Sequence, residues 1–259
     1  MTTYPICKIN IGLHVVSRRE DGYHDIETAF LPVDSLHDTL EITPLDGNAD
    51  ASAITLDGIV LDSAPADNLC LRAYRLMADE FHLPPVAIRL TKGIPFGAGL
   101  GGGSSDAAFT LKMLNTMFAL GLDDSALERR AARLGADCAF FIKCRPAYAT
   151  GIGDRLEPID LPLGNLRTEI AMPEGEHVST REAYAGIHLR PANSRPPLRK
   201  LLANPLGQWR DTIANDFEDS VFPGHPAIAA LKEHMYRRGA VYASMSGSGA
   251  ALYGLFPTD

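Results

Sequence analysis

Hydrophobic and polar residues alternate along much of the first half of the chain, which is typical of β-strands with one buried face. In residues 8–15 aliphatic side chains occupy every second position, so Lys8 and Asn10 lie on the opposite face of the predicted strand. The dipeptide Asp57-Gly58 separates two short apolar runs and predicts a hairpin. Further strands are predicted at residues 23–33, 39–43, 53–56, 59–61, 86–91, 167–172, 240–244 and 250–256.

Other segments repeat their apolar residues at intervals of three and four, which predicts amphipathic helices. The clearest begins after Asn68 and ends near Phe81. Three prolines in residues 190–197 predict a loop. Because helices and strands mix without a regular β-α-β order, the fold class is predicted as α+β, in two domains of residues 1–158 and 159–259. The remaining helices are predicted at residues 104–118, 125–134, 180–188, 211–218 and 226–238.

Residues 97–106 read Gly-Ala-Gly-Leu-Gly-Gly-Gly-Ser-Ser-Asp, and this glycine-rich loop lies between a predicted strand and a predicted helix. A run so poor in side chains cannot pack a core, but it lets a ligand lie directly against backbone N–H groups. The free N–H groups and the positive end of the dipole at a helix N-terminus both favour an anion. The arrangement therefore predicts a phosphate-binding loop.

Three other loop types fit this segment less well. A flexible linker seldom lies between a strand and a capped helix. Gly97, Gly99 and Gly102 match the dinucleotide-binding pattern, but the acidic residues about twenty positions further on, Asp123 and Asp124, begin a predicted helix and end no strand. No Gly-Lys-Ser/Thr follows, so the segment is not a Walker-type P-loop and has no lysine of its own.

The composition limits the possible partners of the chain. Its 259 residues are 46% hydrophobic with a formal net charge of −8, so a large core is expected and non-specific binding to nucleic acid is not. No apolar run has membrane-spanning length and the first residues do not resemble a signal peptide, so a cytoplasmic protein is expected. The cysteines lack the spacing of a zinc site and are expected to be buried thiols in a reducing compartment. They are Cys7, Cys70, Cys138 and Cys144.

The candidate chemistry is concentrated in four segments that lie far apart in the sequence. They are Lys8-Ile-Asn10, the glycine-rich loop, Leu134-Gly-Ala-Asp137 and Met245-Ser-Gly-Ser-Gly249. A phosphoryl-transfer site needs an anion cradle, a cation and a carboxylate near the acceptor hydroxyl, and these segments offer all three. Taken singly, each has an ordinary structural interpretation: Asp137 as a cap or turn residue, Lys8 as a solvated lysine, and residues 246–249 as a tight turn.

In this order the four segments resemble the GHMP kinase superfamily, whose members bind ATP through a loop of this kind. The segment Arg19-Glu-Asp-Gly-Tyr-His24 narrows the resemblance to the branch that phosphorylates the 2-hydroxyl of 4-diphosphocytidyl-2-C-methyl-D-erythritol in the non-mevalonate isoprenoid pathway. The resemblance spans nearly the whole chain. It implies a two-domain GHMP kinase fold, with an N-terminal domain like domain 2 of ribosomal protein S5 and a ferredoxin-like C-terminal domain.

The resemblance also implies roles for individual residues. Asp137 corresponds to the catalytic aspartate and Lys8 to the lysine paired with it. Mg²⁺ is expected with the ATP, and Ser105 or Asp106 is its candidate protein ligand. The implied ATP-binding residues are Asn68, Lys92, Gly97, Gly99, Leu100, Gly101, Gly102, Gly103, Ser104 and Ser105. The residues implied to bind the cytidine diphosphate substrate are Asn10, Tyr23, His24, Thr180 and Tyr184.

Some positions depart from the family pattern, and two alternatives stay open. Cys7 stands where alanine often precedes the lysine, and Asp106 where some relatives carry asparagine. One alternative is a GHMP kinase for a mevalonate-type or homoserine-type acceptor, against which Asp21-Gly-Tyr-His24 argues. The other is a non-catalytic nucleotide-binding module, which the presence of Lys8 and Asp137 disfavours. A monomer or weak homodimer acting on a small molecule, with no nucleic-acid or membrane partner, is expected.

Overall fold

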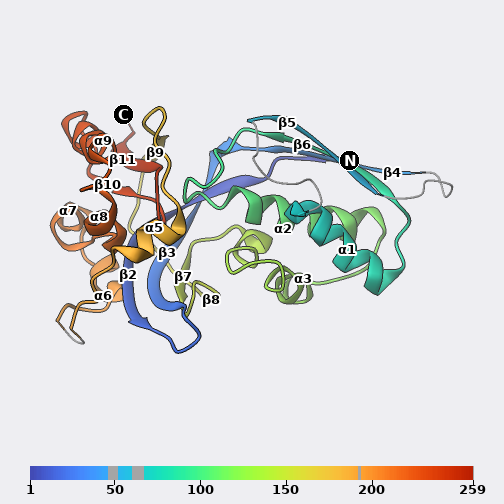
Figure 1. The fold of residues 1–259 in the computed structure, drawn as a ribbon, viewed down its shortest axis with the longest axis horizontal. Coiled ribbons are helices and arrows are strands. Elements are labelled where there is room, and N and C mark those ends of the chain that lie inside the picture. Colours follow the sequence, from blue (N-terminus) through green and yellow to red (C-terminus); the bar gives the residue numbers. More distant parts are fainter. Residues whose placement is uncertain (46–51, 60–66, 192–193, 259) are drawn as a thin grey trace. The chain divides into compact units, whose positions relative to one another are not determined.

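The computed structural model describes residues 1–45, 52–59, 67–191 and 194–258 (Figure 1). The chain forms two compact units, each built from separate segments of sequence. Unit 1 comprises Met1–Cys7, Pro32–Phe96 and Gly101–Arg145, and unit 2 comprises Lys8–Leu31, Gly97–Leu100 and Pro146–Asp259. The boundaries of these compact units do not fall at residue 158. The division into domains 1–158 and 159–259 therefore stays a prediction.

Unit 1 is a four-stranded sheet with helices packed on it. The strand order is β1 (Thr2–Thr3), β4 (Thr39–Pro44), β6 (Val86–Lys92) and β5 (Ala53–Gly58). β6 pairs antiparallel with β4 and parallel with β5, and its alternate residues Val86, Ile88 and Leu90 are buried. Figure 1 shows α1 (Leu69–Phe81) and α2 (Gly102–Met117) along one face of this sheet. The shorter helices α3 (Asp124–Ala131) and α4 (Phe140–Lys143) pack against α2.

The described residues of unit 2 include most of two sheets, five α-helices and a 3₁₀ helix at Leu206–Gln208. One sheet has the order β2 (Ile6–Arg18), β3 (His24–His37), β7 (Ala147–Thr150) and β8 (Arg155–Pro158), and the other the order β10 (Tyr242–Met245), β11 (Leu252–Pro257) and β9 (Leu166–Ala171). The helices are α5 (Thr180–Ala185), α6 (Leu198–Leu202), α7 (Trp209–Thr212), α8 (Asp216–Val221) and α9 (Pro226–Arg237). Leu13, Phe217, Met235 and Leu252 belong to one buried core, so β2, α8, α9 and β11 are packed together.

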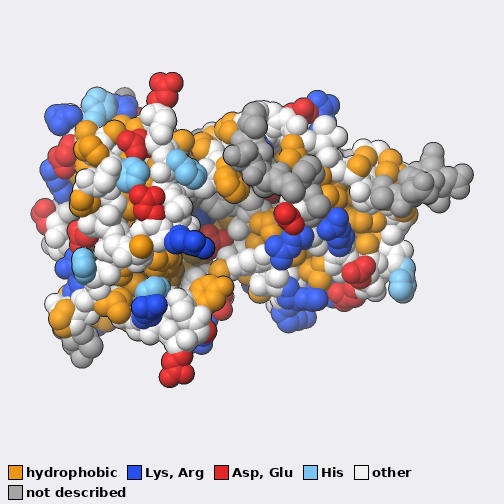
Figure 2. All heavy atoms as spheres, in the orientation of Figure 1, with side chains coloured by type: hydrophobic (Ala, Val, Ile, Leu, Met, Phe, Trp, Pro, Cys, Tyr) orange, Lys and Arg blue, Asp and Glu red, His pale blue; other side chains and the backbone are white. Residues whose placement is uncertain are grey.

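The α+β prediction is confirmed, because strands and helices mix without a repeated β-α-β unit. Cys7, Cys70 and Cys138 are buried thiols as predicted, whereas Cys144 is partly exposed. Basic and acidic side chains are interspersed among the described residues on the face drawn in Figure 2. In the described part of the chain, no helix combines the length and the apolarity that crossing a membrane requires.

Several predicted elements differ from the structure. The helix predicted at residues 211–218 is wrong: α7 and α8 are separate, because Asn215 adopts an extended conformation (φ −101°, ψ 115°) and caps α8. The second strand of the hairpin predicted around Asp57-Gly58 falls mainly outside the described residues, and β5 pairs with β6. The helix predicted to begin at Ser104 begins at Gly102, inside the glycine-rich loop.

Candidate active site

Lys8 lies inside unit 2 and not on a solvated strand face, with 3% of its surface exposed. Its Nζ donates hydrogen bonds to Asn10 Oδ1 (2.6 Å) and to the carbonyl oxygen of Gly99 (3.0 Å), and it lies 5.0 Å from the centre of the Phe30 ring. The backbone N–H of Lys8 donates to the carbonyl oxygen of Leu100 at 3.0 Å. The lysine is therefore fixed to the backbone of the glycine-rich loop at two points.

Gly99 packs against the Met245–Gly249 segment. It has a φ of +76°, and a Cβ there would lie 1.9 Å from the carbonyl oxygen of Ser246, so this position accepts glycine alone. Ser246 Oγ donates to the carbonyl oxygen of Gly99 (2.9 Å) and accepts from the backbone N–H of Asn10 (3.3 Å). Unit 2 thus brings together the strand with Lys8 and Asn10, the first half of the glycine-rich loop, and the Met245–Gly249 segment.

The second half of the glycine-rich loop begins α2 in unit 1. Gly101 is the N-cap residue, with a φ of 72° and no side-chain cap. The first N–H groups of a helix have no partner within the helix, so α2 offers them to an anion together with the positive end of its dipole. Ser105 Oγ, in the first turns of α2, is buried and has no hydrogen-bond partner. This end of α2 therefore combines donors for phosphate with an unused side-chain oxygen.

Asp137 lies next to this end of α2. It is partly buried in a turn between α3 and α4. Its neighbour Cys138 forms a hydrogen bond with Ser104, and a Cβ on Gly135 would lie 4.0 Å from Ser104 Oγ. Burial raises the pKa of the Cys138 thiol to about 11, so the thiol stays protonated at neutral pH. The turn that carries Asp137 and the start of α2 are therefore neighbours in unit 1, whereas the pairing of Asp137 with Lys8, a unit 2 residue, stays a prediction.

Lys92, a predicted ATP-binding residue, ends β6 inside a buried ion cluster. Its Nζ contacts the carboxylates of Asp38 and Asp106, at 2.7 Å from Asp106 Oδ2. All three residues are buried, with at most 5% of their surface exposed. Asp38 Oδ1 also accepts from the backbone N–H groups of Gly93 (2.6 Å) and Ile94 (2.8 Å). Asp38 therefore fixes the chain just before the glycine-rich loop, a role that the sequence did not reveal.

The charges of this cluster are unequal, since two carboxylates share one ammonium group. Burial raises the pKa of Asp106 to about 8, with Lys92 opposing the shift and the Asp38 charge adding to it. Burial opposes the charge of Lys92, but Asp106 and Asp38 outweigh it and raise the pKa of Lys92 above its ordinary value. In the structure Lys92 and Asp106 bind each other. The predicted roles of Lys92 in ATP binding and of Asp106 in metal binding stay predictions.

Asn68 has a clear local function. It is the N-cap residue of α1, and its Oδ1 accepts from the backbone N–H of Cys70 at 2.8 Å. Capping of this kind favours asparagine at the position without any ligand. Its predicted contact with ATP stays a prediction.

The predicted substrate residues gather in unit 2. His24 stacks on Tyr184 with ring centres 4.7 Å apart, and the hydroxyl groups of Thr180 and Ser248 are 3.3 Å apart. Burial, helped by the charge of Arg18, lowers the pKa of His24, so its ring is neutral near pH 7. Tyr23 is 62% exposed. A cavity of about 620 Å³ adjoins the stacked pair, lined by Arg18, His24, Arg181, Tyr184, Ala185, Ile187, His188 and Leu189.

The oxygen atoms at the start of α2 fit a magnesium ion held mainly by nucleotide. Among the described residues, no group of three or more His, Cys, Asp and Glu side chains is placed to hold a metal ion. Mg²⁺ needs no such group, because it usually keeps waters and phosphate oxygens and takes one or two protein oxygens. Ser105 Oγ, buried without a hydrogen-bond partner, can supply one of these.

The chain is similar to known GHMP kinases in sequence and in fold. Family models for the GHMP kinases N terminal domain and the GHMP kinases C terminal region match residues 68–145 and 197–259. A 4-diphosphocytidyl-2-C-methyl-D-erythritol kinase of Bacteroides thetaiotaomicron is 49% identical over 259 residues, which cover 100% of this chain and 93% of the relative. A crystal structure of 4-(cytidine 5'-diphospho)-2C-methyl-D-erythritol kinase matches with a TM-score of 0.80 and 34% identity, over 98% of this chain and 90% of that one. A homoserine kinase from Cytophaga hutchinsonii shares the fold, with a TM-score of 0.70 and 19% identity over 98% of this chain and 85% of that one.

Proposed function

The chain belongs to the GHMP kinase family, and within it to the 4-diphosphocytidyl-2-C-methyl-D-erythritol kinases; we propose that it transfers the γ-phosphoryl group of ATP to the 2-hydroxyl of that substrate. The observation that carries the proposal is the 49% identity to such a kinase over the whole chain. The GHMP kinase fold predicted from the sequence is confirmed. The burial of Lys8, and the presence of Asp137 in a turn beside α2, support a catalytic site and not a silent nucleotide-binding module.

The reaction moves one phosphoryl group and one proton. The phosphates of ATP lie over Gly99–Ser105, where the backbone N–H groups that begin α2 bind them. Asp137 accepts the proton of the 2-hydroxyl while its oxygen attacks the γ-phosphorus, a general-base role worth about 10²–10⁴-fold in rate. Lys8 orients the acceptor and offsets the negative charge that develops. The bond between the γ-phosphorus and the bridging oxygen breaks, and ADP leaves with the electron pair.

Mg²⁺, when bound with ATP, neutralises charge on the β- and γ-phosphates. Ser105 is the residue of this chain that we propose as its ligand, because its hydroxyl is buried and otherwise unused. Asp106 is the second candidate, but its Oδ2 is already bonded to Lys92.

The aromatic residues of unit 2 suit a pyrimidine base. A neutral His24 ring offers both a donor and an acceptor to cytosine, and Tyr184 provides a flat face on which a base stacks. In the structure His24 itself occupies that face, at 4.7 Å. Binding of cytidine would therefore replace the stacking of His24 on Tyr184 by stacking of the base, with exposed Tyr23 available to cover it.

A sibling kinase that acts on mevalonate-type or homoserine-type acceptors is the second candidate. The solved homoserine kinase is 19% identical, and this likeness extends to the fold alone. Neither sibling reaction calls for the aromatic residues around the cavity of unit 2. We expect a small-molecule acceptor, and a monomer or weak homodimer in solution.

An assay of ADP release with a panel of acceptors tests the proposal. Turnover is expected with the cytidine diphosphate substrate and not with homoserine or mevalonate. Asp137→Asn should lower kcat by about 10²–10⁴-fold while binding of the substrate, measured by calorimetry, persists. Asp160→Asn removes one carboxylate from an exposed position and serves as the matched control.

The panel separates the alternatives by outcome. ADP release with another acceptor alone would assign the chain to a sibling activity. Nucleotide binding without ADP release from any acceptor would favour the silent module. An Asp137→Asn variant that keeps most of its turnover would remove Asp137 as the base without affecting the assignment of the substrate.

A further inference from the structure

Two of the five residues of the Met245–Gly249 segment are glycine. Two buried residues bind the backbone of this segment: Asn215, which is the N-cap residue of α8, and Glu218 within α8. Asn215, 1% exposed, caps α8 through Oδ1, which accepts from the N–H of Phe217 at 3.0 Å. Its Nδ2 donates to the carbonyl oxygens of Met245 and Gly247, each at 2.8 Å. These two carbonyls stand on either side of Ser246, so one amide group holds both flanks of that residue.

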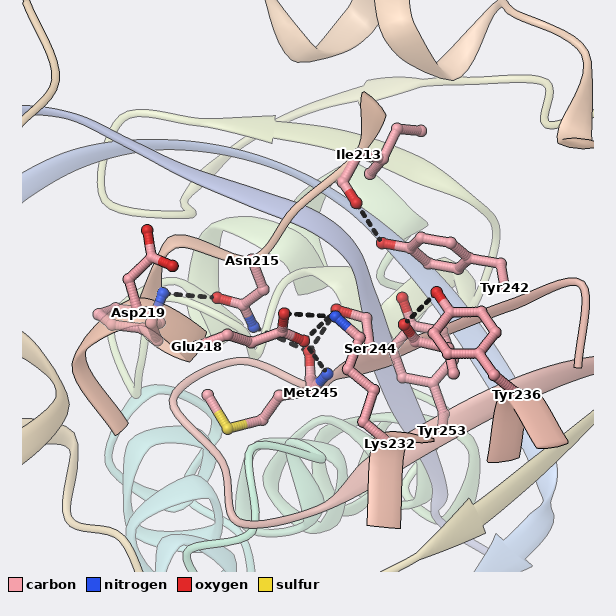
Figure 3. Close-up of polar contacts among 12 residues, drawn as sticks. Ile213, Asn215, Glu218, Asp219, Lys232, Tyr236, Tyr242, Ser244, Met245 and Tyr253 are labelled. Carbon is pink, nitrogen blue, oxygen red and sulfur yellow. Dashed lines mark hydrogen bonds and ion pairs between the residues drawn. The ribbon is translucent and has the colours of Figure 1, made fainter. Parts of the chain in front are cut away.

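Glu218, one turn further along the chain, binds the same segment at Met245 (Figure 3). It is 7% exposed, and its Oε1 accepts from the N–H of Met245 (2.8 Å) and from Ser244 Oγ (3.0 Å). Its Oε2 accepts from Lys232 Nζ of α9 at 2.5 Å, so the buried carboxylate is compensated by a cation. Figure 3 shows the carboxylate of Glu218 pointing toward Ser244 and Met245.

Ser246 connects the restrained segment to the predicted catalytic residue Lys8. Its hydroxyl donates to the carbonyl oxygen of Gly99, to which Lys8 Nζ also donates. The same hydroxyl accepts from the N–H of Asn10, whose Oδ1 is the second acceptor for Lys8. Gly99 and Asn10, two acceptors of the Lys8 ammonium group, are therefore each bonded to Ser246, and every contact in this series is within unit 2. The Asn10 side chain is also held by Thr28, to whose Oγ1 its Nδ2 donates at 3.0 Å.

We propose that Asn215 and Glu218 are positioning residues of the kinase: they fix Ser246, and through it the two acceptors that aim Lys8. The proposal rests on the proposed function, since Lys8 acts in that reaction. Neither residue is exposed enough to touch a substrate, so their effect is on geometry. A displacement of about 1 Å at a reacting group can cost about 10²-fold in rate, which sets the scale of the expected effect.

Asn215→Asp is the sharpest variant, because it separates the two functions of the side chain. The aspartate still caps α8 through the N–H of Phe217, but it presents an acceptor to two carbonyl oxygens that need a donor. We expect kcat to fall about 10–100-fold while KM for the cytidine substrate changes by less than about threefold. Asp219→Asn is the matched control, because Asp219 lies on the same helix with its side chain 75% exposed and pairs with Arg190.

A double-mutant cycle with Ser246→Ala tests the route. If Asn215 acts through Ser246, Asn215→Asp should cause little further loss of kcat in the Ser246→Ala background. Losses that multiply, or an Asn215→Asp variant with unchanged kcat, would overturn the proposal. Glu218→Ala should lower kcat in the same way, and Glu218→Gln should recover part of it because its amide oxygen still accepts from Met245.

Hydrogen exchange of the backbone amides tests the restraint without an activity assay, so its result does not depend on which reaction the protein catalyses. The backbone amides of residues 98–101 and 245–251 should exchange faster in Asn215→Asp than in the wild type, without any substrate present. Unchanged exchange there would contradict the restraint, whether or not the wild type phosphorylates the cytidine substrate. If Asn215→Asp fails to fold, Glu218→Gln and Ser246→Ala carry the same measurements.

Discussion

Asp106→Asn tests the unequal charges of the buried cluster in unit 1. With both carboxylates ionised, Asp38, Asp106 and one Lys92 ammonium group would leave a net negative charge away from water. Burial raises the pKa of Asp106 to about 8, so the folded chain holds a proton on it at neutral pH. Asparagine has nearly the shape of the protonated carboxyl group and its oxygen still accepts from Lys92, but it has no proton to lose.

The sign and size of the effect follow from this pKa. In the unfolded chain Asp106 ionises near its ordinary value of 3.8, far below its value of about 8 in the folded chain. The stability that Asp106 contributes is complete at a pH below its pKa in the unfolded chain, and it is lost as the pH rises through its pKa in the folded chain. The free energy of unfolding falls by up to about 1.4 kcal/mol per pH unit over this range. Between about pH 5 and about pH 8 the free energy of unfolding of the wild type should therefore fall by about 2–4 kcal/mol more than that of Asp106→Asn. The lower figure allows for relaxation of the protein around the cluster.

Urea titrations followed by circular dichroism, at fixed ionic strength and several pH values, measure this difference in the free energy of unfolding. Hydrogen exchange of the α2 amides reports on the same unit locally. Asp79→Asn, on the exposed side of α1, removes the same charge from the surface and is the control. A difference between Asp106→Asn and wild type that does not change with pH would refute the reasoning. It would mean that Asp106 is ionised in the folded chain and paired with Lys92.

Two further substitutions test other parts of the site. Gly99→Ala should lower kcat/KM at least about 10²-fold, because its Cβ would meet the Ser246 carbonyl oxygen at 1.9 Å and displace the loop. Gly121→Ala is the control: its φ is +70° and no atom lies within 4 Å of its Cβ, so it carries the same backbone penalty without the collision. An equal loss of activity in Gly121→Ala would show that the collision is not the cause. Tyr23→Ala should raise KM for the cytidine substrate and leave kcat nearly unchanged, since stacking on a base is worth about 1–3 kcal/mol; an unchanged KM would exclude Tyr23 from the site.

Elements with strong local patterns were predictable from the sequence. Alternation at Val86, Ile88 and Leu90 located β6, because a strand with one buried face leaves that trace whatever its partners are. The helix after Asn68 was located by its apolar stripe and its capping residue. The glycine-rich loop was placed between a strand and a helix because alternating residues precede it and helical spacing follows it. The run of glycines itself indicated close approach of the backbone to a ligand. In each case the signal lies within one short stretch of consecutive residues.

Features that depend on distant partners were not predictable. The alternation around Lys8 suggested a polar strand face, but the structure buries that face, because Gly99 and Phe30 lie against the lysine. The helix predicted at residues 211–218 missed its break, since apolar spacing continues across it and only the capping by Asn215 marks the boundary. No local pattern singled out Asp38, because its partner Lys92 lies 54 positions further along the chain.

The glycine-rich loop makes clear why these missed residues matter to function. Glycines let phosphate approach the backbone, but they provide no side chains that would fix the shape of the loop. The shape must then come from hydrogen bonds supplied by neighbours: in unit 1, Asp38 binds the N–H groups of the two residues after β6, and in unit 2, Ser246 binds the carbonyl oxygen of Gly99. A sequence motif therefore locates such a loop, while its geometry, and with it the rate of reaction, depends on buried polar residues elsewhere in the chain that no motif includes.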